Sequence, residues 1–309
     1  MNDRKRTAAA AVIVLSLLAA GCGSASNDGH AQHASDNQEA ANEHSGHPAS
    51  ENGNAGGDSD ADSHSGHGSD GDGVDSEKPA ADLSQEWRFS PQNPKPGEET
   101  NIELFLYDNA GKPIEKYEVN HEKLMHLIIV SEDMAEFMHI HPEYAGEGKF
   151  EAAASFAKSG AYKLFADFIP TGSAQTTITS TLKVAGAKET AEPLEKDAEL
   201  TKSVDGITAA LKVSSFKAGE EADLTFTFND AATKKPITDL QPYLGAIGHV
   251  VILNKDLTRY LHVHPKDGNG SGPNADFSTS FPEPGLYKIW GQFQRNGKTF
   301  IIPFTVEAE

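Results

Sequence analysis

The sequence predicts an all-β protein: two tandem immunoglobulin-like antiparallel β-sandwiches, made by internal duplication, after a disordered tether. Three observations lead to this fold class. The second half of the chain repeats the first at an offset of 122 to 125 residues. Each copy alternates apolar and polar residues in short runs that Gly, Pro, Asn and Asp separate. Neither copy has a convincing helical pattern, so about 100 residues should form about seven strands.

Residues 1–22 have the pattern of a secretory signal. Arg4, Lys5 and Arg6 precede an apolar stretch, residues 8–20, which is too short to remain as a membrane-spanning helix. Leu18-Ala19-Ala20-Gly21-Cys22 resembles the lipobox of bacterial lipoproteins. The resemblance implies cleavage before Cys22 and a lipid on its sulfur, hence an anchor on the extracytoplasmic side of the cell membrane. An ordinary signal peptide with an incidental cysteine is the alternative.

Cys22 is the only cysteine, which excludes a disulfide within the chain and a thiolate metal site. The folded part must therefore be held together by its apolar cores.

Residues 23–84 form the predicted tether, which contains almost no large apolar side chain and should therefore be disordered. Its histidines come in pairs three residues apart, and such pairs among carboxylates can capture metal ions. The alternative is a solvated spacer in which histidine is one more polar residue. The pairs are His30 and His33, His44 and His47, and His64 and His67.

The net charge of −20 is concentrated near the amino terminus. Residues 23–86 contain fourteen Asp and Glu against one Lys, which leaves thirteen negative charges in that segment. The remaining chain is only mildly acidic and has no basic patch that could neutralise phosphates, so we expect no nucleic-acid partner.

The predicted domains are residues 85–185 and 201–309, joined by a linker over residues 186–200. Gly97-Glu98-Glu99 returns as Gly219-Glu220-Glu221, and each precedes an alternating strand. Gly160-Ala161-Tyr162 returns as Gly285-Leu286-Tyr287, and the last strands are expected over residues 176–184 and 298–306. The small drift in offset is what loop changes after a duplication would give.

Each copy also carries a histidine triplet at relative positions 0, 13 and 15. The members lie on two apolar runs that read as a β-hairpin turning near Asp133 in the first copy and near Asp256 in the second. Residues that face each other across the first hairpin should have numbers that sum to about 265–267, which puts all three imidazoles on one face. Neutral imidazoles suit Cu²⁺ or Zn²⁺. The two triplets are His126, His139 and His141, and His249, His262 and His264.

Four further residues are candidates for additional metal contacts. Asp167 and Gln292 occupy equivalent positions late in each copy and could add a ligand or support one by a hydrogen bond. Met125 and Met138 lie near the first triplet but should point to the opposite face, so core packing is the favoured interpretation. His121 has no histidine counterpart in the second copy, and we expect it to be structural.

These segments together resemble secreted bacterial β-sandwich proteins with YtkA-like or FixH-like domains. The resemblance rests on Pro94 to Glu98, on the hairpin segment 125–133, on His139-Ile140-His141-Pro142, and on residues 162–168. It implies an immunoglobulin-like fold and an extracytoplasmic, copper-associated context.

The leading hypothesis is a membrane-anchored metal-binding protein, with copper favoured over zinc and one three-histidine site per sandwich. It would buffer metal, confer resistance, or deliver the ion to a cuproprotein or metal-transport acceptor. Binding should fade below about pH 6, where ordinary imidazoles protonate. Two alternatives remain: a metal-dependent enzyme with an open three-histidine site, and an adhesion or interaction module whose histidines bind no metal.

Overall fold

The computed structural model describes residues 81–309 except 188–191, 262, 267 and 269, and it describes His264 by its backbone alone. The described residues belong to one compact unit. They form strands and connecting turns, and no helix among them could cross a membrane. The predicted signal segment, Cys22, and almost all of the predicted tether with its six histidines lie outside the described residues.

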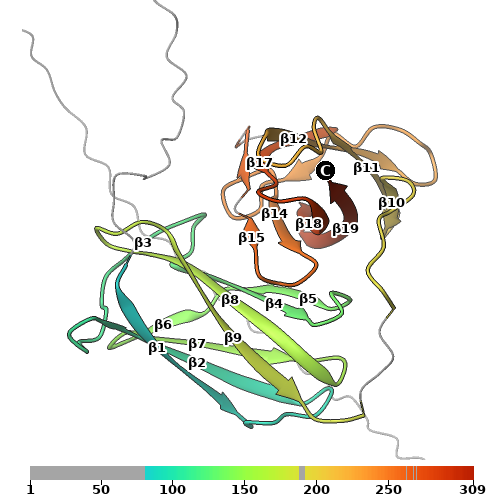
Figure 1. Cartoon of the computed structure of the whole chain (residues 1–309). Coiled ribbons are helices and arrows are strands. Elements are labelled where there is room, and N and C mark those ends of the chain that lie inside the picture. The colour runs from blue at the N-terminus through green and yellow to red at the C-terminus, as the bar shows by residue number, and fades with distance from the viewer. Residues whose placement is uncertain (1–80, 188–191, 262, 267, 269) are drawn as a thin grey trace, which may run out of the picture. The chain divides into compact units, whose positions relative to one another are not determined.

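The first sandwich has two antiparallel sheets (Figure 1). One sheet has the order β1-β2-β7-β6. In the other, β8 pairs with β3, β4 and β9, and β5 pairs with β4. The strands are β1 Leu83–Ser90, β2 Glu99–Asp108, β3 Tyr117–Glu118, β4 Met125–Ser131, β5 Phe137–Ile140, β6 Glu143–Gly146, β7 Lys149–Ser155, β8 Gly160–Pro170 and β9 Thr176–Val184.

The second sandwich repeats this arrangement after the chain crosses the predicted linker. One sheet has the order β10-β11-β12-β17-β16, and the other is built around β18, which pairs with β19, β13 and β14. The predicted tandem all-β sandwich fold is confirmed. The strands are β10 Thr201–Val204, β11 Ile207–Val213, β12 Glu221–Asp230, β13 Leu240–Gln241, β14 His249–Asn254, β15 Tyr260–Leu261, β16 His264–Pro265, β17 Asn274–Ser280, β18 Gly285–Arg295 and β19 Lys298–Ala308.

The cores follow from strand alternation. In β2 every second side chain points inward, so Ile102, Leu104 and Leu106 are buried while their neighbours face outward. Their equivalents in β12 include Phe226 and Phe228, which pack among further phenylalanines. Burying each such side chain contributes roughly 1.5–3 kcal/mol, which holds both sandwiches without a disulfide.

Strand β4 is buried along its whole length, on both faces. Met125, Leu127 and Ile129 point into the core of the first sandwich. Ile128 and Val130 point the other way, into a third apolar cluster that joins the two sandwiches. We call this third group the interface cluster: Ile128, Val130, Met134, Phe165, Val251, Leu253, Leu257 and Trp290.

The interface cluster is built from equivalent residues of the two copies. Phe137 of the first copy stacks on Trp290 of the second at 4.8 Å between ring centres. Phe165 of the first copy and Tyr260 of the second occupy the positions equivalent to Trp290 and Phe137, and they stack at 5.8 Å between ring centres. Each copy therefore gives the same pair of positions to the other, as subunits do across the two-fold axis of a symmetric dimer. This packing places the histidine-bearing faces of the two hairpin sheets against each other.

Candidate metal centre

The first histidine of each triplet lies at the start of an inner strand, and the same kind of hydrogen bond fixes its ring in both copies. A two-residue turn precedes it, and the carbonyl group of the residue just before that turn accepts a hydrogen bond from the imidazole. His126 Nε2–H donates to the Asn120 carbonyl at 2.9 Å, and His249 Nε2–H donates to the Tyr243 carbonyl at 2.9 Å. Because a carbonyl only accepts, Nε2 carries the proton in each ring, and Nδ1 presents a lone pair.

The other two histidines of the first triplet come from β5 and the residue after it. The register pairs His139 with Ile128 and Ile140 with Leu127, and both pairs sum to 267, within the predicted range. His139 therefore shares the face of β4 that carries His126 and Ile128. His141 follows directly after β5, before Pro142.

These three imidazoles meet. Their ring centres are 5.2 Å apart for His126 and His139, 5.0 Å for His126 and His141, and 4.7 Å for His139 and His141. One ring nitrogen from each lies within 4.8 Å of the others. Two imidazoles that bind one ion at about 2.0–2.1 Å place their ring centres roughly 5 Å apart. The spacing is therefore that of three ligands around one ion.

The protonation of His139 is set from the second sandwich. His139 Nδ1–H donates to Gln292 Oε1 at 2.9 Å, and the amide nitrogen of Gln292 lies 3.3 Å from the hydroxyl group of Tyr243. With its proton on Nδ1, His139 turns the lone pair of Nε2 toward His126 Nδ1, 3.0 Å away. Two lone pairs at this distance repel each other unless a proton or a metal ion lies between the rings.

Burial disfavours the protonated, positively charged form of the three imidazoles. It lowers the pKa of His126, and it holds the pKa of His139 well below its ordinary value, with His126 and His141 adding to the effect. Burial lowers the pKa of His141 to about 4. The cluster is therefore neutral at physiological pH, the state in which imidazoles bind metals. Proton competition should begin at a lower pH than the value near 6 expected for ordinary imidazoles.

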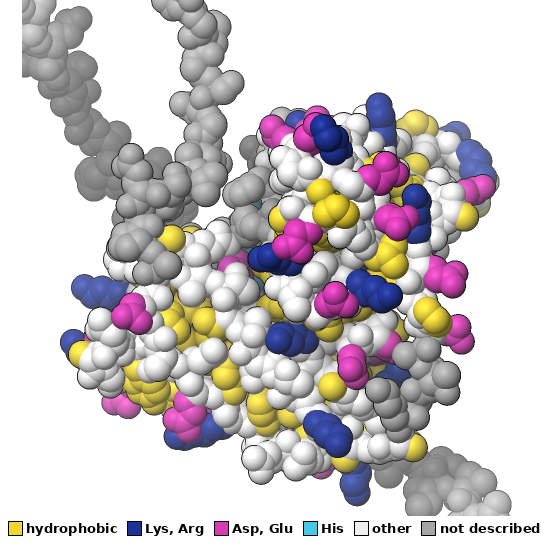
Figure 2. Space-filling model, in the orientation of Figure 1, with side chains coloured by type: hydrophobic (Ala, Val, Ile, Leu, Met, Phe, Trp, Pro, Cys, Tyr) yellow, Lys and Arg dark blue, Asp and Glu magenta, His cyan; other side chains and the backbone are white. Residues whose placement is uncertain are grey.

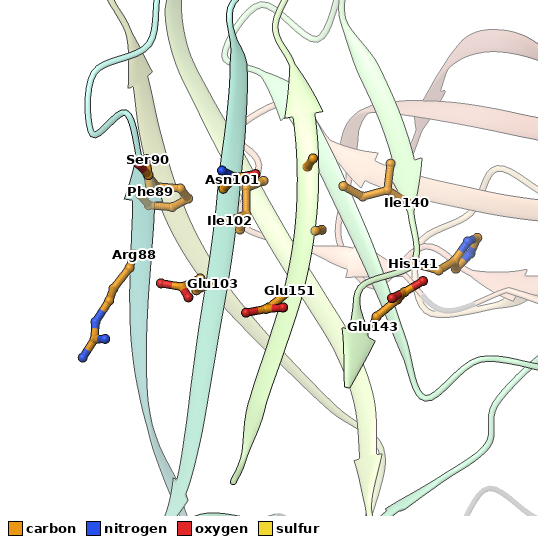
Figure 3. Close-up of a pocket in the computed structure, with 12 residues that line it drawn as sticks. Arg88, Phe89, Ser90, Asn101, Ile102, Glu103, Ile140, His141, Glu143 and Glu151 are labelled. Atoms are coloured by element: carbon orange, nitrogen blue, oxygen red, sulfur yellow. The ribbon is translucent and has the colours of Figure 1, made fainter. Parts of the chain in front are cut away.

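His141 also lines an open groove of about 810 Å³ along the first sheet. Figure 3 shows Glu103, Glu143 and Glu151 along this groove, with His141 at its end and its imidazole pointing away from Glu103 and Glu151. Yet His141 Nε2 is buried and has no hydrogen-bond partner. An orphaned ring nitrogen beside two other imidazoles is a group that a ligand would satisfy.

The other predicted site residues fall in different places. Gln292, 7% exposed, supports His139 as described, and Asp167, 2% exposed, accepts hydrogen bonds from Thr177 Oγ1 at 2.9 Å and Gln175 Nε2 at 2.5 Å. Burial raises the pKa of Asp167 to about 6. Met125 and Met138 lie on the face opposite the histidines and pack in the first core.

The second triplet is described only in part. His249 lies beside the first triplet, with its ring centre 6.1 Å from that of His126 and 6.0 Å from that of His139. His262 lies outside the described residues, and the side chain of His264 is likewise not described.

Sequence reasoning gave no function to His121, which the structure places 4.8 Å from His249 between ring centres. His121 sits at the tip of the turn before β4, whose counterpart in the second copy contains Leu244. The sequence shows that His121 lies five residues before His126, but its partner ring, His249, comes from the other sandwich.

The chain belongs to the family described as "Domain of unknown function (DUF8832)", which matches twice, over residues 81–186 and 202–309. The two matches correspond to the two sandwiches. The comparison with curated proteins gives no match.

The comparison with solved structures gives matches that share little sequence with this chain. The Escherichia coli adhesin FdeC is 16% identical over 75% of this chain and 67% of its own, with a TM-score of 0.26. The Yersinia pseudotuberculosis adhesin InvE is 13% identical over 73% of this chain and 60% of its own, with a TM-score of 0.25. Salmonella alpha-2-macroglobulin is 12% identical over 74% of this chain and 15% of its own, with a TM-score of 0.26. Similarity at this level carries no argument about function.

Proposed function

We propose that this protein is an extracytoplasmic metal-binding protein that holds Cu²⁺ in the cluster of His126, His139 and His141. The observation that carries the proposal is the pair of ring nitrogens, His126 Nδ1 and His139 Nε2, that face each other at 3.0 Å. Hydrogen bonds to the Asn120 carbonyl and to Gln292 place the proton of each ring on its other nitrogen. A cation coordinated by both lone pairs removes their repulsion.

The geometry favours copper over zinc. An ion about 2.05 Å from each of these nitrogens would subtend an angle of about 94° at it. That angle is close to the right angle of a tetragonal Cu²⁺ centre and narrower than the tetrahedral angle preferred by Zn²⁺. Copper also binds more tightly than zinc to nitrogen ligands in general. The resemblance to YtkA-like and FixH-like domains points to the same metal.

The surroundings suit capture and transfer better than catalysis. His141 lines an open groove that also contains the carboxylate of Glu143, so an incoming ion could reach that ring from solvent. Glu103 and Glu151, further along the groove, are paired with Lys149. We propose that a lipid on Cys22 anchors the chain to the membrane, and that the paired tether histidines gather ions for the folded site. The role would be copper buffering, resistance, or delivery to a cuproprotein or transport acceptor.

A metal titration tests the proposal. The chain is titrated with Cu²⁺ and Zn²⁺, and the variant His141→Ala is compared with Ile140→Val, which alters the neighbouring position in the same strand. His141 is part-exposed and lies beyond the strand, so its loss should leave the fold intact. We expect tight Cu²⁺ binding that His141→Ala weakens at least tenfold and Ile140→Val leaves unchanged.

The same titration separates the rival hypotheses. An adhesion or interaction module predicts no stoichiometric metal in the folded part of the chain. An enzyme with an open three-histidine site predicts metal binding together with hydrolase or oxidase turnover that His139→Ala abolishes.

A further inference from the structure

A second pair of imidazoles, His121 and His249, lies beside the first cluster and spans the two sandwiches. The two rings are nearly perpendicular, at 87°, with centres 4.8 Å apart. This separation falls within the range of 4.7–5.2 Å found within the His126, His139 and His141 cluster. The pair therefore has the spacing of two ligands on one ion.

His249 is prepared as a ligand in the same way as His126. Its Nε2–H is committed to the Tyr243 carbonyl, so Nδ1 holds the lone pair. Burial lowers the pKa of His249 to about 3, with His121 and His126 adding to the effect, so the ring is neutral.

A small cavity of about 30 Å³ lies among these residues, lined by His121, His126, His139, His249 and Asp167 among others. A site needs about 10–15 Å³ to hold a water molecule, so this cavity has room for one ion. Its wall carries imidazole and carboxyl groups from the first sandwich and an imidazole from the second. The cavity is thus lined by both domains, partly by polar and partly by apolar side chains, and has the size of a single bound species.

The backbone holds His121 at this place. Asn120 and Lys123 exchange backbone hydrogen bonds across a two-residue turn, in which His121 and Glu122 both have left-handed φ angles of 46° and 62°. Such turns favour Asn and Gly, so His and Glu are costly choices by local conformation alone. The corresponding turn of the second copy contains Gly245, and a Cβ atom there would lie 3.3 Å from the Glu122 carboxylate. The two turns therefore meet at the interface.

We infer that His121 and His249 form a second cation site, suited to Cu²⁺ or Zn²⁺ by its imidazole nitrogens, which bridges the two sandwiches next to the first metal. This inference rests on the proposed metal-binding function but assigns a ligand that the triplet pattern omits and places the second ion between the domains. An ion bound there links one sandwich to the other, so metal loading strengthens the interface.

The test uses the full chain with alanine at the six tether histidines, so that the tether cannot compete for metal. Ions per chain are measured with Cu²⁺ and with Zn²⁺ after gel filtration, and the two-copper form is examined by electron paramagnetic resonance. Two Cu²⁺ ions within several ångströms of each other give a half-field transition, which isolated ions do not. The variants are His121→Ala, His249→Ala, His141→Ala and the double variant His262→Ala/His264→Ala. Leu244→Ala is the matched control, because Leu244 occupies the place of His121 in the second turn.

We expect two ions per chain with a half-field signal in the parent and in Leu244→Ala. His121→Ala and His249→Ala should each retain one ion and lose the signal. If both variants keep the second ion, or if only the His262/His264 variant loses it, the second ion belongs elsewhere and the inference is wrong. A parent that binds one ion, lost in His141→Ala, would uphold the proposed function and overturn only the bridging site. A parent that binds none would overturn both.

Discussion

Gln292 offers a sharp test of how the second sandwich prepares the first metal site. In Gln292→Met the acceptor for His139 Nδ1–H disappears. His139 can then move its proton to Nε2 and donate to His126 Nδ1, 3.0 Å away. One hydrogen bond replaces another, so the free energy of unfolding of the metal-free chain should fall by only about 1 kcal/mol. The new bond, however, uses both lone pairs that the metal requires.

The metal affinity should fall far more than the stability. Losing a hydrogen-bond partner that orients a metal-binding histidine costs about 10–100-fold in affinity, equal to about 1.4–2.7 kcal/mol. Competition for Cu²⁺ with a chromogenic chelator measures this change directly. Gln292→Glu keeps an acceptor oxygen and should retain the affinity. Gln294→Met, two residues along β18, is the matched control. An unchanged affinity in Gln292→Met, or an equal loss in Gln294→Met, would refute the tautomer argument.

Three further predictions follow from the same structure. Burial lowers the pKa of the histidines in the folded, metal-free cluster, whereas histidines in the unfolded chain titrate near pH 6.5, so the free energy of unfolding should fall as the pH drops from about 6.5 to about 4. His141→Ala should reduce this pH dependence, measured by urea melts at pH 4.5 and 7.5. A free energy of unfolding that does not change with pH would contradict the prediction. Trp290→Ala removes a buried indole that stacks on Phe137, so it should lower the free energy of unfolding, measured by thermal melts, by about 3–5 kcal/mol. A decrease below about 1 kcal/mol would mean that the contact between the two sandwiches contributes little to stability. Gly248→Ala puts a Cβ atom 2.9 Å from the backbone carbonyl oxygen of Gln292 and against the Phe293 ring. This overpacking should lower the free energy of unfolding by about 1–3 kcal/mol in the same melts. An unchanged free energy of unfolding would show that β14 can shift to make room.

The charges on the surface fit the composition. Figure 2 shows acidic and basic side chains interspersed over the face that it draws, with no continuous basic patch there. The negative charge that the sequence concentrates before residue 87 lies almost entirely outside the described residues.

The sequence alone determined the fold class and the local geometry of the first triplet. Period-2 alternation fixes which face each residue takes once a strand forms, and the hairpin turn fixes which residues are opposite. His126, His139 and His141 therefore had to share a face, and Met125 and Met138 had to take the other. These are local consequences of backbone geometry, which is why the spacing of residues in the sequence predicts on which face of the sheet they lie.

Only the tertiary structure decided how the two copies relate. The duplication predicts one three-histidine site per sandwich, and the second of these stays a prediction because His262 and the side chain of His264 are not described. A sequence repeat carries no information about which surfaces the copies present to each other. The interface cluster packs the histidine-bearing faces together, so Gln292 supports His139, and His249 lies beside His121. Those contacts join residues more than 120 positions apart, and they depend on complementary packing of Phe137, Trp290 and their equivalents. Long-range packing of this kind has no periodic signature in the sequence.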